Sequence, residues 1–173
     1  GEWPSPIADA YASLRTCLRV SEPGTILWSL KDLVEILIRL PVLIMARDVI
    51  EHGPPGDAAM VRRSMLGGPL TMGSWLRVLR DELAPLVASD AEGRYAMSQA
   101  LGAVHVSLAR NGGRDPTPYA RLLGNIVPWR NDVAHGVFRT EADAYTSELV
   151  AWIEQLDRAL EAQVAARVWQ DVL

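Results

Sequence analysis

The chain has 173 residues, of which 49% are hydrophobic and 22% are charged, and this composition excludes disordered, collagen-like and low-complexity proteins. The length predicts one globular domain over residues 1–173 and leaves open that this domain is a fragment of a larger protein. Because the formal net charge is −4, nonspecific binding of nucleic acid over the whole surface is disfavoured, and any such contact should be local.

Cysteine and histidine usage argues against disulfides and structural metals. A single cysteine, Cys17, cannot close an internal disulfide, which favours a reducing compartment such as the cytoplasm. The histidines lie far apart in sequence and have no neighbouring cysteine, so a closed zinc site is not expected. No basic segment followed by an apolar run is visible at the start of the chain, so no signal peptide is expected. The three histidines are His52, His105 and His135.

The first third of the chain predicts two helices. Apolar residues at helical spacing predict a helix over residues 6–20, followed by a turn at 21–24. Residues 25–51 form the most aliphatic stretch, and we expect a long buried helix there, kinked at Pro41. Charged side chains inside this stretch argue against a membrane-spanning segment, because charges at bilayer depth are rare and costly.

These charged side chains form a stripe on the long helix. At 100° per residue, they fall within an arc of about 100°. The favoured interpretation is a solvated face with ion pairs between residues four apart, and the alternative is a stripe that lines a functional cleft. The residues are Lys31, Asp32, Glu35 and Arg39.

The middle of the chain predicts further helices. A short helix is expected around residues 58–65, and Ser74 is typical of the N-cap of a helix over 75–87. These segments are separated by glycine and proline residues, which break helices.

A further helix should start at Ser89 or Asp90 and reach about residue 110. His105 lies on it between two valines, where a lone histidine is most often a hydrogen-bonded core or groove residue and less often catalytic. A cluster of breakers follows at residues 111–116.

Two prolines indicate where the next helices begin. Thr117 and Pro118 should start a helical segment that runs toward Gly124. Pro128 interrupts this pattern, and it is suited to the first turn of a new helix.

The last segment predicts a helix that ends near residue 169. Thr140 and Asp143 are spaced as in a capping box at its start. No segment alternates with period two for long enough to predict a strand. The fold class is therefore expected to be all-α, a helical bundle.

Several common catalytic motifs are absent from the sequence. The only lysine, Lys31, follows a leucine, so there is no phosphate-binding loop of the Walker A type. The glycines lack dinucleotide-binding spacing, and no His-x-x-x-His or paired cysteine motif offers a metal site. We therefore expect neither a metal nor a cofactor.

One group of residues has the chemistry of a site. Arg130, Asn131 and His135 follow Pro128, and if Pro128 begins a helix, Arg130 lies in its first turn, where free N–H groups attract anions. Asn131 and His135 are four residues apart, so the amide can hydrogen-bond the imidazole. An imidazole exchanges protons near neutral pH, and a guanidinium stabilises charge on a phosphate. This set suits metal-free cleavage of RNA, whose 2′-hydroxyl is an internal nucleophile.

A structural role for the same residues stays open. A basic residue followed by glycine, as in His135 and Gly136, is also typical of a helix C-cap. Arg130 can also pair with Asp132 or with a neighbouring helix.

The six residues from Arg130 to His135 resemble the R-polar-x-x-x-H motif of the HEPN superfamily, a group of all-helical domains of comparable size. The resemblance implies a metal-independent endoribonuclease that acts as a homodimer and leaves a 2′,3′-cyclic phosphate. It implies that Arg130 binds the phosphate, that Asn131 positions, and that His135 is catalytic. It also implies a charged residue on an earlier helix, for which Glu35 and Asp32 are the candidates.

The resemblance also suggests a setting, namely the effector or toxin domain of a bacterial defence or toxin–antitoxin system. The expected partners are RNA, a second copy of the chain, and an antitoxin or a fused sensor or ATPase domain, with no membrane. Arg121 and Arg139 are candidates for RNA contacts. Val137 stands where one branch of the superfamily has a tyrosine, so regulation through that tyrosine is not expected here.

The competing hypothesis is a non-catalytic helical module that dimerises or binds a nucleotide or a partner. In that case the motif only stabilises its helix. The enzyme hypothesis requires Arg130 and His135 to be partly exposed, and burial of both would favour the module.

Overall fold

The computed structural model describes residues 3–20, 22–108 and 114–170, and within these ranges the chain is mostly helical. The expected all-α class is confirmed, with the addition of one short hairpin. The elements, in chain order, are α1 (Ser5–Val20), α2 (Pro23–His52), α3 (Pro55–Leu66), α4 (Met72–Arg77), the π-helical η1 (Val78–Leu83), α5 (Ala84–Ala88), α6 (Gln99–His105), β1 (Val106–Leu108), β2 (Arg114–Pro116), α7 (Pro118–Ala134), α8 (Glu141–Ala144) and α9 (Ser147–Ala165).

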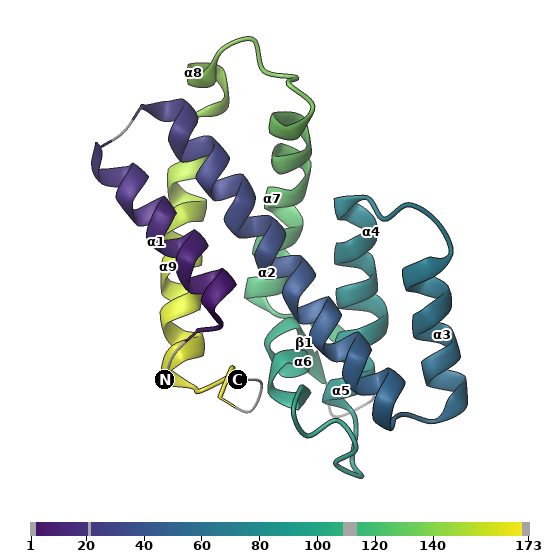
Figure 1. Ribbon diagram of the computed structural model, residues 1–173. Coiled ribbons are helices and arrows are strands. Elements are labelled where there is room, and N and C mark those ends of the chain that lie inside the picture. The colour runs from purple at the N-terminus through teal and green to yellow at the C-terminus, as the bar shows by residue number, and fades with distance from the viewer. Residues whose placement is uncertain (1–2, 21, 109–113, 171–173) are drawn as a thin grey trace.

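The long helix α2 is the centre of the bundle. It contacts α1 along its first half, α7 and α8 on another side, and α3, α4 and η1 toward its end (Figure 1). Its apolar residues point in several directions, as expected for a helix covered on most sides. Side chains on α2 that are fully buried are Leu30, Leu33, Val34, Leu37, Ile38, Val42, Met45 and Val49.

The helix α2 continues through Pro41 without a break. Proline lacks the N–H group that would bond the carbonyl one turn earlier, so a helix interior normally resists it. Pro41 is buried among the apolar residues of the bundle, and this packing holds the helix together. Among the described residues, no helix combines the length and the apolar character that a membrane crossing requires.

The expected helix from residue 89 or 90 to about 110 is wrong at both ends. The buried carboxylate of Asp90 accepts hydrogen bonds from the backbone N–H groups of Glu92 and Tyr95 and from Nε of Arg94. These bonds fold the chain into turns, because a side chain that captures nearby N–H groups competes with the helix. The helix α6 therefore starts only at Gln99.

The other end of that expected helix is a strand. Val106 to Leu108 pairs antiparallel with Arg114 to Pro116, and Val106 lies opposite Pro116. The prediction of no strands is therefore wrong for these two short segments. Residues 111–113 of the expected breaker cluster lie outside the described residues.

The helices α4 and α8 both begin with a threonine cap. The N-cap of α4 is Thr71, whose Oγ1 accepts the N–H of Ser74 at 3.2 Å, so the N-cap lies three residues before the predicted one. The capping box forms, since Thr140 Oγ1 accepts the N–H of Asp143 at 3.2 Å and Asp143 Oδ2 accepts the N–H of Thr140 at 3.1 Å. Its expected place at the start of the last long helix is wrong, because it begins the short helix α8, whereas α9 begins at Ser147 with its own N-cap, Thr146.

The helix α7 is continuous from Pro118 to Ala134, so the helix expected to begin at Pro128 is wrong. Its N-cap is Thr117, as predicted, which accepts the N–H of Ala120. Pro128 lies on the exposed side, whereas the buried side of the helix continues past it from Ile126 to Val133. Packing of this face against the bundle outweighs the local preference of proline for a helix start.

Candidate functional site

The motif lies at the carbonyl end of α7, not at an N–H end. Its last turn closes with Gly136 in the left-handed region, at φ +65°, which a glycine adopts without strain. The N–H of Gly136 bonds the carbonyl of Val133 at 3.2 Å, and the N–H of Val137 bonds that of Asp132 at 3.0 Å. This is the pattern of a Schellman cap. The expected attraction of anions by a helix N-terminus is therefore wrong here, and side chains must supply the positive charge.

Arg130 reaches across from α7 to α2. One of its terminal nitrogens, Nη2, donates to Oε1 of Glu35, and the other, Nη1, donates to Oδ1 of Asn131 at 3.0 Å. The side chains of Arg130 and Glu35 are only 13% and 15% exposed. The pair joins residues 95 positions apart in sequence and brings the expected earlier-helix candidate Glu35 onto the motif.

Glu35 is shared by three cations. Besides Arg130, Lys31 Nζ lies 3.0 Å from its Oε1 and Arg39 Nη1 lies 3.5 Å from its Oε2. Burial alone would raise the pKa of Glu35, but hydrogen bonds from Arg130 and Lys31 outweigh it and lower that pKa below its ordinary value. The carboxylate therefore stays charged well into the acid range. The expected ion pairs of the α2 stripe form, but Lys31 and Glu35 are only 12% and 15% exposed, so this part of the stripe is not the solvated face that the sequence favoured.

Two features set how Arg130 can act on a ligand. Its Nε–H is buried and has no hydrogen-bond partner among the described residues. A buried donor without a partner is unusual in folded proteins. The side chain of Arg130 as a whole is only 13% exposed, so a ligand would reach this guanidinium through a small part of its surface.

His135 is exposed and serves as the C-cap residue of α7. The expected side-chain hydrogen bond between Asn131 and His135 is not formed, and the side-chain oxygen of Asn131 accepts from Arg130. The structure therefore joins Arg130, Asn131 and Glu35 in one network, while His135 is exposed and makes no side-chain hydrogen bond to that network.

The remaining candidate residues differ in how close they lie to the motif. Asp32 is 64% exposed and binds Lys31 at 2.8 Å, so it does not contact the motif. Arg121 lies in the first turn of α7, about 20 Å along the helix from His135 at 1.5 Å per residue. Arg139 follows the Schellman cap and lies near the motif end of α7. Of the two expected RNA contacts, only Arg139 is close.

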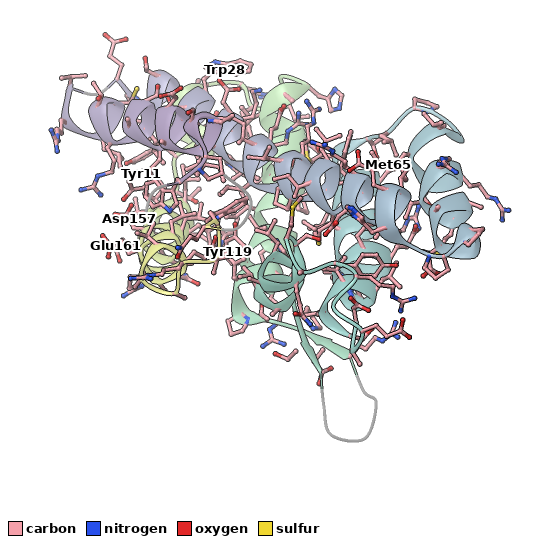
Figure 2. All side chains as sticks on the ribbon, turned by 60° about the horizontal axis from the view of Figure 1, so that its bottom comes forward. Tyr11, Trp28, Met65, Tyr119, Asp157 and Glu161 are labelled. Atoms are coloured by element: carbon pink, nitrogen blue, oxygen red, sulfur yellow. The ribbon has the colours of Figure 1, made fainter. Side chains whose placement is uncertain are left out.

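A hollow beside the motif was missed from the sequence. It has a volume of about 200 Å³ and lies between the first turns of α2 and the loop after α7. Trp28, 50% exposed, forms part of it, and Figure 2 shows this residue on the side of α2 that faces away from α9. The sequence did contain a signal for this hollow, because Trp28 lies one helical turn before Lys31 and therefore on the same face as the charged stripe. The lining residues are Gly24, Leu27, Trp28, Val133, Gly136, Phe138, Arg139, Thr140 and Ala144.

The other histidines lie outside this site. His105 is buried as expected, but its Nδ1 has no hydrogen-bond partner among the described residues, and burial lowers its pKa to about 4. His52 Nδ1 lies 2.9 Å from the buried carboxylate of Asp48. In the described part of the chain, no group of three or more His, Cys, Asp or Glu side chains could hold a metal ion.

Comparisons with known proteins leave the interpretation of this site to its own residues. No model of a protein family matches the chain, and neither does any curated protein or solved structure. The likeness to the HEPN superfamily therefore rests on the motif and on what surrounds it.

Proposed function

We propose that this chain is a metal-independent endoribonuclease of the HEPN type that acts as a homodimer. The observation that carries the proposal is the contact between Glu35 and Arg130, in which α2 supplies the charged residue that the resemblance implies for the motif. The exposed imidazole of His135 supports it, because a residue that exchanges protons with substrate must reach the substrate.

In this proposal the reaction is a transfer within the RNA strand. The 2′-oxygen attacks the adjacent phosphorus and forms a new P–O bond, while the bond from phosphorus to the 5′-oxygen of the next nucleotide breaks. One imidazole takes the proton of the 2′-hydroxyl, and a second gives a proton to the departing 5′-oxygen. The products are a 2′,3′-cyclic phosphate and a free 5′-hydroxyl.

The need for two imidazoles explains why a dimer is proposed. Each protomer offers one histidine at the motif, His135. Two copies facing each other supply both a base and an acid at one scissile bond. The RNA, held between them, also meets a guanidinium from each side.

Arg130 stabilises the negative charge that grows on the phosphate oxygens. Glu35 is a positioning residue, because it fixes the plane of the guanidinium and does not itself touch the substrate. Three cationic side chains, Lys31, Arg39 and Arg130, stand against Glu35 and Asp32, and the exposed Asp132 of the motif balances the remaining positive charge. The site is therefore close to neutral in a chain whose net charge is −4, and an RNA phosphate would be held by the guanidinium of Arg130 itself.

The biological setting proposed from the resemblance is the cytoplasmic effector or toxin part of a bacterial defence or toxin–antitoxin system. An antitoxin or a fused sensor or ATPase domain would then restrain or trigger cleavage. The local charge at the motif is small, so a further domain that binds RNA would add affinity.

A second candidate function is favoured by the burial of Arg130. A mostly buried ion pair between α2 and α7 is also what a non-catalytic module would use to hold these helices together. In that case the bundle dimerises or binds a nucleotide or a partner protein, and His135 is only a cap.

His135→Ala separates the two candidates. His135 is exposed, so its loss should change the free energy of unfolding by less than about 0.5 kcal/mol. If the enzyme proposal holds, wild-type protein cuts single-stranded RNA in EDTA, and the variant loses this activity at least 100-fold, the lower range for a catalytic acid or base.

The matched control is His52→Gln, which changes another half-exposed histidine while keeping a donor for Asp48. It should cut RNA like the wild type. Equal cutting by His135→Ala and wild type would reject the proposal. Mass spectrometry of the products should detect the cyclic phosphate.

A further inference from the structure

The hollow beside the motif has walls of two kinds. Trp28 and Phe138 contribute aromatic rings, and Arg139 contributes a guanidinium. Val133 and Gly136 belong to the end of α7, so the hollow adjoins the cap residue His135. An apolar wall with a cation at its edge matches a ligand that is both flat and anionic.

Trp28 is connected to the motif through two side chains, Lys31 and Glu35. Lys31 Nζ lies 5.3 Å from the centre of the Trp28 ring and 3.0 Å from Glu35, which in turn binds Arg130. The cation holds one side of the indole and leaves the ring half exposed. The exposed aromatic surface is therefore fixed in place relative to Arg130.

The size of the hollow limits its occupant. At about 200 Å³ it is smaller than the pockets that enclose a whole drug-sized ligand, and it suits a single ring system. The guanidinium of Arg139 in its lining favours an anionic ligand over an apolar peptide. A nucleotide in a single strand has both a flat ring and a phosphate.

We propose that the hollow binds one base of the RNA next to the scissile phosphate, with the base stacked on Trp28 and Arg139 contacting the phosphate on its far side. This inference rests on the proposed function. It adds a base-binding subsite to the site of cleavage, and it makes Trp28 a determinant of where the strand is cut.

The test measures binding of a 2′-O-methylated single-stranded oligonucleotide, which lacks the nucleophile and is not cleaved. Fluorescence anisotropy should show that Trp28→Ala binds roughly 5- to 150-fold more weakly than wild type, the usual range for loss of one stacked base. Trp28→Phe should recover most of the affinity. Met60→Ala, which trims an exposed apolar residue on α3, is the matched control and should bind like wild type.

An abasic oligonucleotide makes the test specific for stacking. Removal of one base at the right position should weaken binding to wild type and should have little further effect on Trp28→Ala. An equal loss for both proteins at every position would overturn the inference. A change of oligomeric mass in Trp28→Ala would also overturn it, because the hollow would then be covered by a second copy.

Failure of this inference can be told apart from failure of the proposed function. His135-dependent cutting with unchanged binding by Trp28→Ala rejects only the base-binding hollow. Trp28-dependent binding without His135-dependent cutting supports the hollow and rejects the enzyme.

Discussion

At the scale of single residues, Arg130 has two features that the sequence suggested as alternatives, namely its place in the motif and an ion pair with a neighbouring helix. It belongs to the motif, and it also pairs with a neighbouring helix through Glu35. A change in melting temperature on loss of Arg130 therefore does not decide between enzyme and module. The exposed His135, which carries no such pair, is the residue whose loss reports on chemistry alone.

Arg130→Ala should lower stability as well as abolish cleavage. Glu35 keeps Lys31 and Arg39, so we expect a loss of about 1–3 kcal/mol, the range for a buried polar group left with an incomplete set of partners. Urea unfolding measures the loss. Arg47→Ala, at an exposed ion pair on α2, is the control and should change stability by less than about 1 kcal/mol. An Arg130→Ala protein as stable as wild type would contradict the importance of this contact.

His105 should make the protein less stable in mild acid. Its pKa is lowered to about 4 in the fold because the buried imidazole resists protonation, while the unfolded chain takes up the proton near pH 6.5. The unfolded state then binds more protons between these values, so stability falls as the pH falls. From pH 7 to pH 5 the expected loss is about 2 kcal/mol.

Urea unfolding at the two pH values gives this difference directly. His105→Gln removes the titrating group and should flatten the dependence over the same interval. The lowered pKa of Glu35 also makes stability fall as the pH falls, because the unfolded chain binds the proton first, but this effect develops mainly below the ordinary value of 4.5 and so lies mostly outside this interval. A variant that keeps the full pH dependence would assign the effect to another group.

At the scale of elements, the features that could be predicted from the sequence are those that depend on residues close together in the chain. Thr117 as an N-cap and the box of Thr140 with Asp143 depend on residues three apart, and both form. The interruption expected at Pro128 does not occur, because packing of the buried face of α7 is decided by distant residues. The turns set by Asp90 were missed, since its capture of backbone N–H groups leaves no mark in helical periodicity.

The candidate site also contains one part that could be predicted from the sequence and one part that could not. The motif residues were found because they are neighbours in sequence, whereas the network that Glu35 makes with Arg130 joins positions 95 residues apart. A helix face could suggest Glu35 and Asp32 equally, and only the crossing of α2 and α7 selects Glu35. Whether the motif lies at the N–H end or at the carbonyl end of a helix could not be predicted, because it depends on where α7 begins and ends.

Two glycines, Gly124 inside α7 and Gly136 just after its end, should respond to alanine with opposite signs. Gly136 has φ +65°, so Gly136→Ala should cost about 1 kcal/mol through strain in the cap. Gly124 lies inside the helix with open space around it, so Gly124→Ala should stabilise by up to about 1 kcal/mol. Thermal unfolding compares the two variants. A stabilising Gly136→Ala would contradict the left-handed cap.

At the scale of the whole molecule, the two ends of the described chain are tied together away from the motif. Tyr11 on α1 donates to Asp157 on α9 at 2.5 Å, and Figure 2 shows these two residues side by side. Arg15 binds the same carboxylate, and the pKa of Tyr11 rises to about 12 through burial and this contact. The helices α1 and α9 are therefore joined by both a hydrogen bond and an ion pair.

Mixing protomers tests whether two copies share a site. Wild-type protein mixed and equilibrated with excess His135→Ala should lose activity more steeply than dilution alone, because a mixed dimer lacks one of the two imidazoles. Cleavage rates across a series of mixing ratios provide the measurement. A decline that follows the wild-type fraction linearly would mean that each protomer acts alone.

Under the proposed function, the carboxylate of Glu35 would also limit which anions bind at the motif. Any phosphate that approaches Arg130 meets a guanidinium already paired with a negative group, so it must compete for the remaining donors. We expect free phosphate and mononucleotides, which make no other contact with the protein, to compete poorly. An RNA strand bound at several points would overcome this competition, and the protein would thereby discriminate polymers from the small anions that surround it.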